Sequence, residues 1–312
     1  MLRLLFVMDP YQSMLSDRDT SFAFMQAATA RGHVCHHCLP HELFARGNRV
    51  GVVCRQIQLD AAGGPTRALA DTSYDIEQFD AIAVRKDPPF DLAYLALTHL
   101  LEVGSAPFVF NAPAALRDAN EKLFALHFSA WMPETLVSSQ TTRLLEFARE
   151  VGGHAVIKPL DGAGGSGVVG FHAHDRHARG IVDLLTQEGR RLAMVQAFEP
   201  AVLGGDKRVL LLEGEILGAI RRVPRDDDIR ANIHVGGRVE ATELSHREKE
   251  LVAAVGPVLA DRGLYFVGLD LIGEKLIEIN VTSPTGVQEL ARLTGTRPAQ
   301  TVIEWLERKV QH

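Results

Sequence analysis

Short apolar runs alternate with longer mixed stretches over the first third of the chain, a pattern that predicts strands alternating with helices. Strands are expected at residues 2–8, 33–39, 79–84 and 107–111, and helices at about 20–32 and 91–103. We interpret residues 47–59 as a hairpin and residues 61–66 as a loop containing glycine and proline. This alternation indicates a parallel α/β sheet, a fold that binds ligands at the carboxyl ends of its strands.

The rest of the chain carries a second series of apolar runs. The expected strands are residues 134–138, 154–158, 167–171, 192–198, 209–212, 216–223, 265–272 and 276–281, of which the last two form a hairpin. The expected helices are residues 141–152, 175–188, 245–262, 286–294 and 298–310. Pro113 is placed in a loop, and Asn120 and Lys122 lie at the beginning of, or within, the helix that follows it.

A glycine-rich loop joins two of these strands. Lys158 ends the incoming strand, and the loop then carries Gly162, Gly164, Gly165 and Gly167. The spacing matches G-x-G-x-x-G, but the third glycine opens an apolar strand, whereas in a dinucleotide-binding fold it would open a helix. The Gly-Lys-Ser/Thr ending of a Walker-type phosphate loop is absent. The pattern predicts a loop whose backbone amides close over phosphates. The alternative is a surface hairpin whose glycines serve turn geometry.

Two cations follow the predicted strand at 79–84. Arg85 and Lys86 stand at its carboxyl end, and Pro88 and Pro89 stiffen the segment after them. Because open α/β sheets bind ligands at this edge, we interpret both cations as contacts for an anion. The alternative is that they are solvated surface charges.

Two acids interrupt the last predicted hairpin. Asp270 and Glu278 lie in very apolar strands, and Asn280 lies two residues after Glu278 on the same face. Two carboxylates and an amide oxygen are hard ligands that suit Mg²⁺ or Mn²⁺. The alternative is that the acids are isolated from each other and paired with Arg208 or Arg222.

The metal hypothesis makes a geometric demand on this hairpin. A two-residue turn at Gly273 and Glu274 would pair Asp270 with Ile277 and place the acids on opposite faces. An odd-numbered loop centred on Glu274 would pair Asp270 with Glu278. We therefore expect the odd-numbered loop.

Composition and charge narrow the class of protein. The chain has 312 residues, 46% of them hydrophobic and 23% charged, which suits two or three subdomains. The net charge is -6 without a long basic run, so nucleic acid is not an expected partner. No apolar run has the length of a membrane span, and the apolar start is too short for a secretory signal. We expect a cytoplasmic protein that does not enter a membrane.

The chain has three cysteines, Cys35, Cys38 and Cys54. An odd count in a cytosolic chain argues against a disulfide framework. Cys35 and Cys38 form a histidine-flanked CxxC motif, which is typical of zinc sites. Strand alternation would place the two thiols on opposite faces, so we favour a structural strand over a zinc site.

The order of a lysine strand, a glycine loop and an apolar strand carrying Asp and Glu-x-Asn resembles that of the ATP-grasp ligases. Longer motifs are similar to those of the bacterial glutathione synthetase family, over residues 3 to about 305. These motifs are Val7–Pro10, Arg85–Asp91, Leu116–Leu123, Lys158–Gly162, Gly205–Leu210 and Glu278–Thr285.

The resemblance implies an ATP-grasp fold of three domains. These are an N-terminal parallel α/β domain at 1–119, a central lid domain at 120–200 and a C-terminal antiparallel-sheet catalytic domain at 201–312. It further implies that ATP and Mg²⁺ or Mn²⁺ are used to join γ-glutamylcysteine and glycine through an acyl phosphate. The family is usually a homotetramer, so a homo-oligomer is expected.

The resemblance also implies a role for each matching residue. Contacts to the ATP phosphates are implied for Lys122, Lys158, Gly162, Gly164, Gly165 and Gly167. Adenine would be held by Gln196, Ala197, Phe198 and Glu199, with Asp206 near the ribose. The metal ligands would be Asp270, Glu278 and Asn280. The peptide substrate and acyl phosphate would be bound by Arg208, Arg222, Arg230, Asn232, Ser283 and Thr285, with Arg85 and Lys86 nearby.

Three other interpretations remain open. The first is a related ATP-grasp carboxylate–amine ligase with another small acid or peptide as substrate. The second is a nucleotide-binding regulatory protein without turnover, against which the metal-ligand set argues, because binding alone needs fewer ligands. The third is a Rossmann dehydrogenase, which would need a helix after Gly167.

Overall fold

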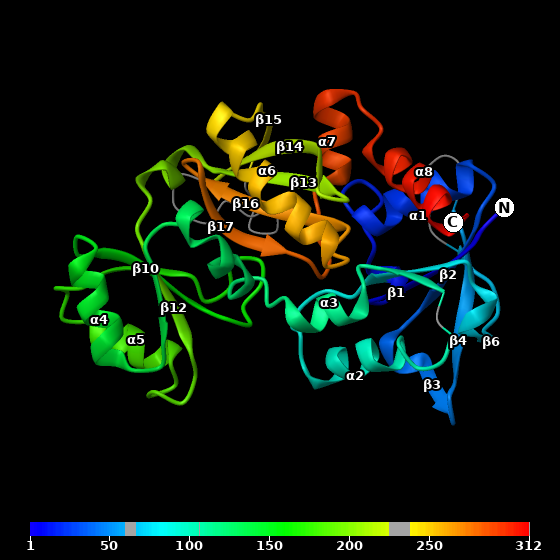
Figure 1. Ribbon diagram of the computed structural model, residues 1–312, viewed down its shortest axis with the longest axis horizontal. Coiled ribbons are helices and arrows are strands. Elements are labelled where there is room, and N and C mark those ends of the chain that lie inside the picture. Colours follow the sequence, from blue (N-terminus) through cyan, green and yellow to red (C-terminus); the bar gives the residue numbers. More distant parts are fainter. Residues whose placement is uncertain (60–66, 106, 225–237, 312) are drawn as a thin grey trace.

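The computed structural model describes residues 1–59, 67–105, 107–224 and 238–311, and its strands form three sheets of eight, four and five strands (Figure 1). The predicted loop at 61–66 lies outside the described residues. Helices accompany each sheet, so the chain has a mixed α/β fold, as the sequence predicted. In Figure 1 the four-stranded sheet stands apart at one end, and both termini lie at the other.

The first sheet has a parallel centre, β2-β1-β7-β8, as the alternation of strands and helices predicted. Its strands are β1 (Arg3–Met8), β2 (Val34–Cys38), β7 (Ala81–Arg85) and β8 (Phe108–Phe110). An antiparallel edge extends it with β3 (Leu43–Arg46), β4 (Arg49–Gln58), β5 (Arg67–Ala68) and β6 (Thr72–Asp75). The accompanying helices are α1 (Thr20–Ala30), α2 (Leu92–Leu100) and α3 (Pro113–Asp118). Short 3₁₀ turns lie at Tyr11–Ser13, Pro40–Glu42 and Ile76–Gln78.

The prediction of a hairpin within residues 47–59 was wrong, because β4 is one continuous strand. Its middle, Val52–Cys54, contains no turn-forming residue and continues the β pattern. The turn lies earlier, where Gly47 has a φ of 64° and joins β3 to β4. The antiparallel edge therefore begins before the segment in which we expected it.

The two thiols of the CxxC motif lie on opposite faces of β2. Cys35 packs in one core cluster with Met25, and Cys38 packs in the other with Cys54. All three cysteines are free and buried. Within the described residues, no group of three or more His, Cys, Asp or Glu side chains is placed to hold a metal ion. The prediction that this strand is structural fits the observed packing.

The second sheet, ordered β11-β10-β12-β9, is antiparallel throughout. Its strands are β9 (Thr135–Ser138), β10 (His154–Pro159), β11 (Val169–His172) and β12 (Ala193–Ala197). Helices α4 (Thr141–Glu150) and α5 (Ala178–Leu185) bury Leu144, Leu145, Ala148, Ala178 and Val182 in the core cluster on this sheet. The glycine-rich loop connects β10 to β11, which confirms the predicted strand–loop–strand.

The third sheet, ordered β15-β14-β13-β16-β17, is also antiparallel. Its strands are β13 (Asp206–Leu212), β14 (Glu215–Val223), β15 (Arg238–Ala241), β16 (Phe266–Ile272) and β17 (Lys275–Asn280). A 3₁₀ turn, η5 (Pro200–Gly204), leads into it, and α6 (His246–Asp261) begins at a Ser245 cap. Within the described residues, no helix is long and apolar enough to cross a membrane.

The last two helices return to the first sheet. Helix α7 (Val287–Thr294) leads to α8 (Pro298–Val310), which lies beside α1 (Figure 1). Arg31 after α1 donates to Glu307 of α8 at 2.7 Å, and Trp305 packs in the core with Phe24. The C-terminal segment thus ties the third sheet to the first.

The segment after β8 differs from the prediction. Pro113 opens α3, where its missing N–H costs nothing, and does not lie in a loop. Asn120 and Lys122 lie in a turn between α3 and the 3₁₀ helix η4 (Phe124–Trp131), not in a helix. The Asn120 Oδ1 accepts from the amides of Lys122 at 3.1 Å and Leu123 at 3.0 Å. This side-chain turn fixes the direction in which Lys122 points.

Candidate active site

Two cavities meet at Asp270 and Glu278, which line both of them. The first cavity is also lined by Lys122, Lys158, Gly162, Gly165, Ser166, Gln196, Ala197, Phe198, Glu199 and Asp206. The second cavity is also lined by Arg18, Asp19, Thr20, Ser21, Arg85, Glu121, Gly164, Arg208, Arg222, Asn280, Thr282, Ser283, Pro284 and Thr285. The site residues predicted from two distant parts of the sequence are therefore brought to one place.

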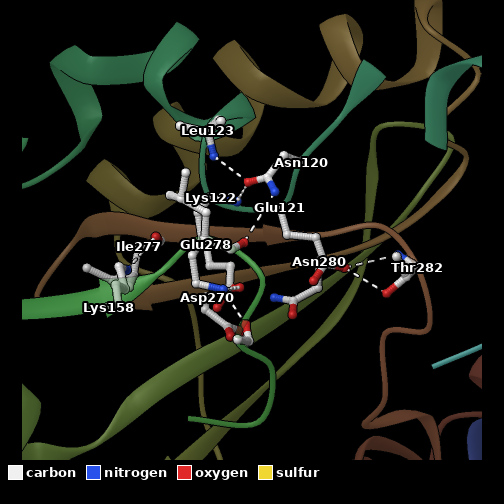
Figure 2. Close-up of polar contacts among 12 residues, drawn as sticks. Asn120, Glu121, Lys122, Leu123, Lys158, Asp270, Ile277, Glu278, Asn280 and Thr282 are labelled. Carbon is white, nitrogen blue, oxygen red and sulfur yellow. Dashed lines mark hydrogen bonds and ion pairs between the residues drawn. The ribbon is translucent and has the colours of Figure 1, made fainter. Parts of the chain in front are cut away.

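Lys158 lies on β10 of the second sheet, with its ammonium group at the first cavity. It is 4% exposed, and its Nζ donates to the Ile277 carbonyl of β17 at 3.3 Å (Figure 2). Burial lowers the pKa of Lys158 to about 8, although Glu278 acts in the opposite direction. A buried ammonium that forms no ion pair in the described part of the chain is suited to bind an anionic ligand.

Lys122 reaches the same place from the turn after α3. Its Nζ donates to Glu278 Oε1 at 2.9 Å and to the Gly162 carbonyl of the glycine-rich loop at 2.5 Å (Figure 2). Lys122, which the sequence alone would place in solvent, is thus 3% exposed. It links the glycine-rich loop to the hairpin of β16 and β17 that carries Asp270 and Glu278, the acid hairpin.

The acid hairpin has the expected pairing of Asp270 with Glu278, but its turn differs from the predicted one. Asp270 lies opposite Glu278, as the metal hypothesis required. However, the turn has two residues, Gly273 and Glu274, with φ values of 53° and 64°, so the odd-numbered loop was a wrong prediction. A bulge at Ile277 supplies the extra residue and restores the shared face. The carbonyl of this bulge residue is the one that accepts from Lys158.

Asp270 is also paired with both guanidinium groups that the alternative interpretation named. Arg208 donates to it at 2.6 and 3.1 Å, and Arg222 forms an ion pair with it at 3.0 Å. Burial alone would raise the pKa of Asp270, but the two guanidinium groups outweigh this and hold the pKa below its usual range. Arg222 also donates to Asp206 at 2.6 and 2.7 Å. The acids are thus both adjacent to each other and charge-paired.

The hairpin offers a hard-oxygen donor set for a divalent cation. Asp270 and Glu278 face each other, and Asn280 lies on the same face of β17. Because the Asn280 Nδ2 donates to the Gly268 carbonyl at 3.2 Å, its Oδ1 is left as an acceptor. Carboxylate and amide oxygens suit Mg²⁺ or Mn²⁺, and ligand phosphate oxygens would complete the coordination, so these residues fit such an ion.

The glycine-rich loop lies over both cavities. Gly162 and Gly165 line the first cavity, and Gly164 lines the second. Gly167, which lines neither cavity, has a φ of 74°, and a Cβ there would lie 2.9 Å from Pro159 Cγ, so only glycine fits without rearrangement.

The segment at the end of β12 forms a wall of the first cavity. The Phe198 ring stacks on His154 with centroids 3.7 Å apart, and Gln196 donates to Thr135 Oγ1 at 3.0 Å. Glu199 forms an ion pair with Lys275 at 3.0 Å. These contacts give the cavity one flat aromatic side and one polar edge.

The predicted substrate residues divide into three groups. Arg85, Arg222, Ser283 and Thr285 line the second cavity together with Arg208. Lys86 does not line it, because it pairs with Asp9 at 3.1 Å and donates to the Asp87 carbonyl at 2.7 Å. Arg230 and Asn232 lie outside the described residues.

Glu121 is a site residue that the sequence analysis did not find. It lines the second cavity and accepts from the amide of Thr282 at 3.1 Å. Its sequence signal was its place between Asn120 and Lys122 in the turn. In the helix predicted for that segment, Glu121 would point away from Lys122.

Two antiparallel sheets meet at one cavity, to which the second presents Lys158 and the third presents Asp270 and Glu278. Beside a parallel α/β unit, this arrangement defines an ATP-grasp enzyme. The chain is similar to the crystal structure of D-cycloserine synthetase DcsG, with a TM-score of 0.67 and 16% identity over 97% of this chain and 99% of that one. This likeness shows the shared fold.

The chain belongs to the prokaryotic glutathione synthetase family. The family's N-terminal domain model matches residues 2–117, and its ATP-grasp domain model matches residues 121–295. The chain is 45% identical to glutathione synthetase of Parasynechococcus marenigrum (strain WH8102), over 98% of this chain and 99% of that protein. It is 40% identical to glutathione synthetase of Thermosynechococcus vestitus (strain NIES-2133 / IAM M-273 / BP-1), over 96% and 98% respectively. It is therefore an ATP-dependent ligase with the activity of this family.

Proposed function

We propose that the chain joins γ-glutamylcysteine and glycine to form glutathione, and releases ADP and phosphate. The observation that carries this proposal is that a cavity suited to a nucleotide and a cavity rich in guanidinium groups meet at one acid pair, Asp270 and Glu278. A carboxylate resists attack by an amine until it is phosphorylated. The shared edge is where a terminal phosphate and a peptide carboxylate would meet and form an acyl phosphate.

On this proposal, ATP lies in the first cavity. Lys122 and Lys158 bind its phosphates, and the amides of Gly162 and Gly165, which line this cavity, cover them. The segment Gln196, Ala197, Phe198 and Glu199 holds the adenine, and Asp206 lies near the ribose. Water exclusion by the loop protects the acyl phosphate from hydrolysis.

Asp270, Glu278 and Asn280 would hold Mg²⁺ or Mn²⁺, which neutralises phosphate charge when bound. Lys122 now pairs with Glu278 and would exchange this partner for a phosphate when the ion takes its place. Arg208, already placed by Asp270, stabilises the charge that develops on the transferred phosphoryl group.

The peptide substrate occupies the second cavity, where Arg85, Arg222, Ser283 and Thr285 are its contacts. Arg230 and Asn232 are proposed to complete the site around the acyl phosphate. Lys86 pairs with Asp9, so it would affect the substrate only through its positive charge and not through a direct contact.

Mass spectrometry of the products from ATP, γ-glutamylcysteine and glycine tests this function. We expect glutathione and ADP in equal amounts. A panel of other acids and amines addresses the second candidate, a related carboxylate–amine ligase. Faster product formation with another pair, and none with γ-glutamylcysteine and glycine, would contradict the proposal.

Phe198→Ala should raise the KM for ATP about 5- to 150-fold, because a ring that stacks on a base contributes on the order of 1–3 kcal/mol. The kcat should change little, since the residue is distant from the reacting phosphate. Steady-state kinetics with varied ATP measure this. Phe44→Ala, at a half-exposed ring on β3, is the matched control. An unchanged KM in Phe198→Ala would remove Phe198 from the adenine site.

The kcat/KM for ATP should fall as the pH rises through about 8. The pKa of Lys158 is lowered to about 8 by burial, so the free enzyme loses the ammonium group above that pH. Lys158→Arg should lack this alkaline limb, because a guanidinium stays protonated. Persistence of the same limb in Lys158→Arg would assign it to another group.

We also propose three structural units, at 1–119, 120–200 and 201–312, which the three separate sheets support. A cytoplasmic location fits the use of ATP, and a homotetramer is proposed from the family resemblance. Light scattering after size exclusion tests the assembly. A monomer at micromolar concentration would contradict it.

A further inference from the structure

Glu121 places a carboxylate on the second cavity that none of the roles above uses. Its Oε1 accepts three hydrogen bonds, one from the Val281 amide at 2.9 Å. The other two come from Thr282, from its amide at 3.1 Å and its hydroxyl at 2.9 Å (Figure 2). In the part of the chain that the structure describes, Oε2 accepts no hydrogen bond and Glu121 forms no ion pair. One oxygen thus holds the loop after β17, and the lone pairs of the other are left for a ligand.

Among the described residues, no positively charged side chain pairs with Glu121. Burial raises the pKa of Glu121 and the nearby Glu278 raises it further, while the hydrogen bonds from Thr282 and Val281 act in the opposite direction. The two acids that line both cavities do have positively charged partners. Asp270 is paired with two guanidinium groups, and Glu278 is paired with Lys122. Asp19 and Asp87 also line this cavity, but Arg85 offsets part of their charge. A cationic ligand group would therefore be stabilised at Glu121.

Arg85 is the counterpart of opposite sign in the same cavity. It is 4% exposed, and its donors go to neutral oxygens, to Ser21 Oγ at 3.1 Å and to the Pro284 carbonyl at 2.9 Å. Within the described residues it forms no ion pair, and Asp19 and Asp87 act on it only at longer range. A ligand carboxylate would supply the missing charge.

Glu121 and Arg85 hold the same loop. Glu121 binds Thr282 and Arg85 binds Pro284, two residues later, so the two anchor points are at most about 7 Å apart along the chain. Both charged groups thus lie at one loop of the second cavity, each without an ion-pair partner among the described residues. An α-amino acid head group, whose ammonium and carboxylate are joined through a single carbon, would complement both.

We propose that Glu121 binds the α-ammonium group of the γ-glutamyl residue of the peptide substrate, while Arg85 binds its α-carboxylate. This inference rests on the proposed function, which supplies a substrate with such a head group. Glycine also carries an ammonium group, but it must become a neutral amine to attack the acyl phosphate. A fixed anion beside glycine would hold it in the unreactive form, so the γ-glutamyl head group is the better occupant.

Glu121→Gln tests the charge while keeping the shape. The amide carbonyl can accept the three hydrogen bonds of Oε1, so the loop stays in place. We expect the KM for γ-glutamylcysteine to rise about 10- to 100-fold, because a hydrogen bond to a charged group is lost. The KM values for ATP and glycine should stay within about twofold of wild type. Glu188→Gln, on an exposed side chain outside both cavities, is the matched control.

Glutarylcysteine, which lacks only the α-amino group, separates recognition from loop placement. Wild type should use it with a kcat/KM about 10- to 100-fold below that for γ-glutamylcysteine, whereas Glu121→Gln should use both alike. The wild-type comparison does not depend on the folding of a variant. Equal use of both compounds by wild type would overturn the proposal. So would a penalty in Glu121→Gln that is the same for both compounds, or one confined to glycine. Failure of the proposed function itself would appear separately, as wild type that forms no glutathione at all.

Discussion

Lys158→Met should lower kcat for glutathione formation about 100- to 1,000-fold, the usual loss when one group that stabilises transition-state charge is removed. The ammonium is buried and is held by the Ile277 carbonyl of the bulge, and within the described residues it forms no ion pair with a carboxylate. The ammonium can therefore stabilise the negative charge that develops on the transferred phosphoryl group. Steady-state release of ADP with all three substrates present measures the effect.

The controls for this variant separate charge from packing. Lys158→Arg should retain more activity than Lys158→Met, although the larger group will not fit the same space. Lys249→Met, on an exposed lysine of α6, should behave as wild type. Near-wild-type ADP release by Lys158→Met would remove Lys158 from the phosphate site.

Asp270→Asn should lower the free energy of unfolding by about 3–5 kcal/mol, because it leaves buried guanidinium groups without their counter-charge. Arg208 would lose its carboxylate partner, and Arg222 would keep only Asp206. The variant should also lose nearly all ligase activity, since a proposed metal ligand and the orientation of Arg208 disappear together. Urea unfolding and ADP release measure the two effects.

The matched control is Asp261→Asn, on an exposed aspartate at the end of α6, which should change neither quantity. A stable Asp270→Asn variant with a raised Mg²⁺ requirement would confine the role of Asp270 to the metal. A stable and fully active variant would contradict both roles.

Much of the fold could be predicted because its elements are locally encoded. The apolar runs at β1, β7, β10 and β16 are short and bounded by turn or cap residues, so each strand is visible without its neighbours. The alternation along β2 also placed Cys35 and Cys38 on opposite faces. The lysine and acid motifs were visible because charges are uncommon in apolar strands.

What could not be predicted depends on contacts between distant segments. The bulge at Ile277 has no turn residue that would predict it, and it lies where Lys158 of another sheet donates a hydrogen bond to its carbonyl. Lys122 is solvated in any local view and becomes buried only through Glu278 and Gly162. Glu121 likewise acquires its place from Val281 and Thr282, about 160 residues later in the chain.

The transfer of oxygen from substrate to phosphate tests most directly whether the two cavities cooperate in forming an acyl phosphate. The experiment uses γ-glutamylcysteine labelled with ¹⁸O in the cysteinyl carboxylate, with unlabelled ATP and glycine. We expect each turnover to place one labelled oxygen in the released phosphate, detected by mass spectrometry. Glutathione formed with unlabelled phosphate would contradict the account.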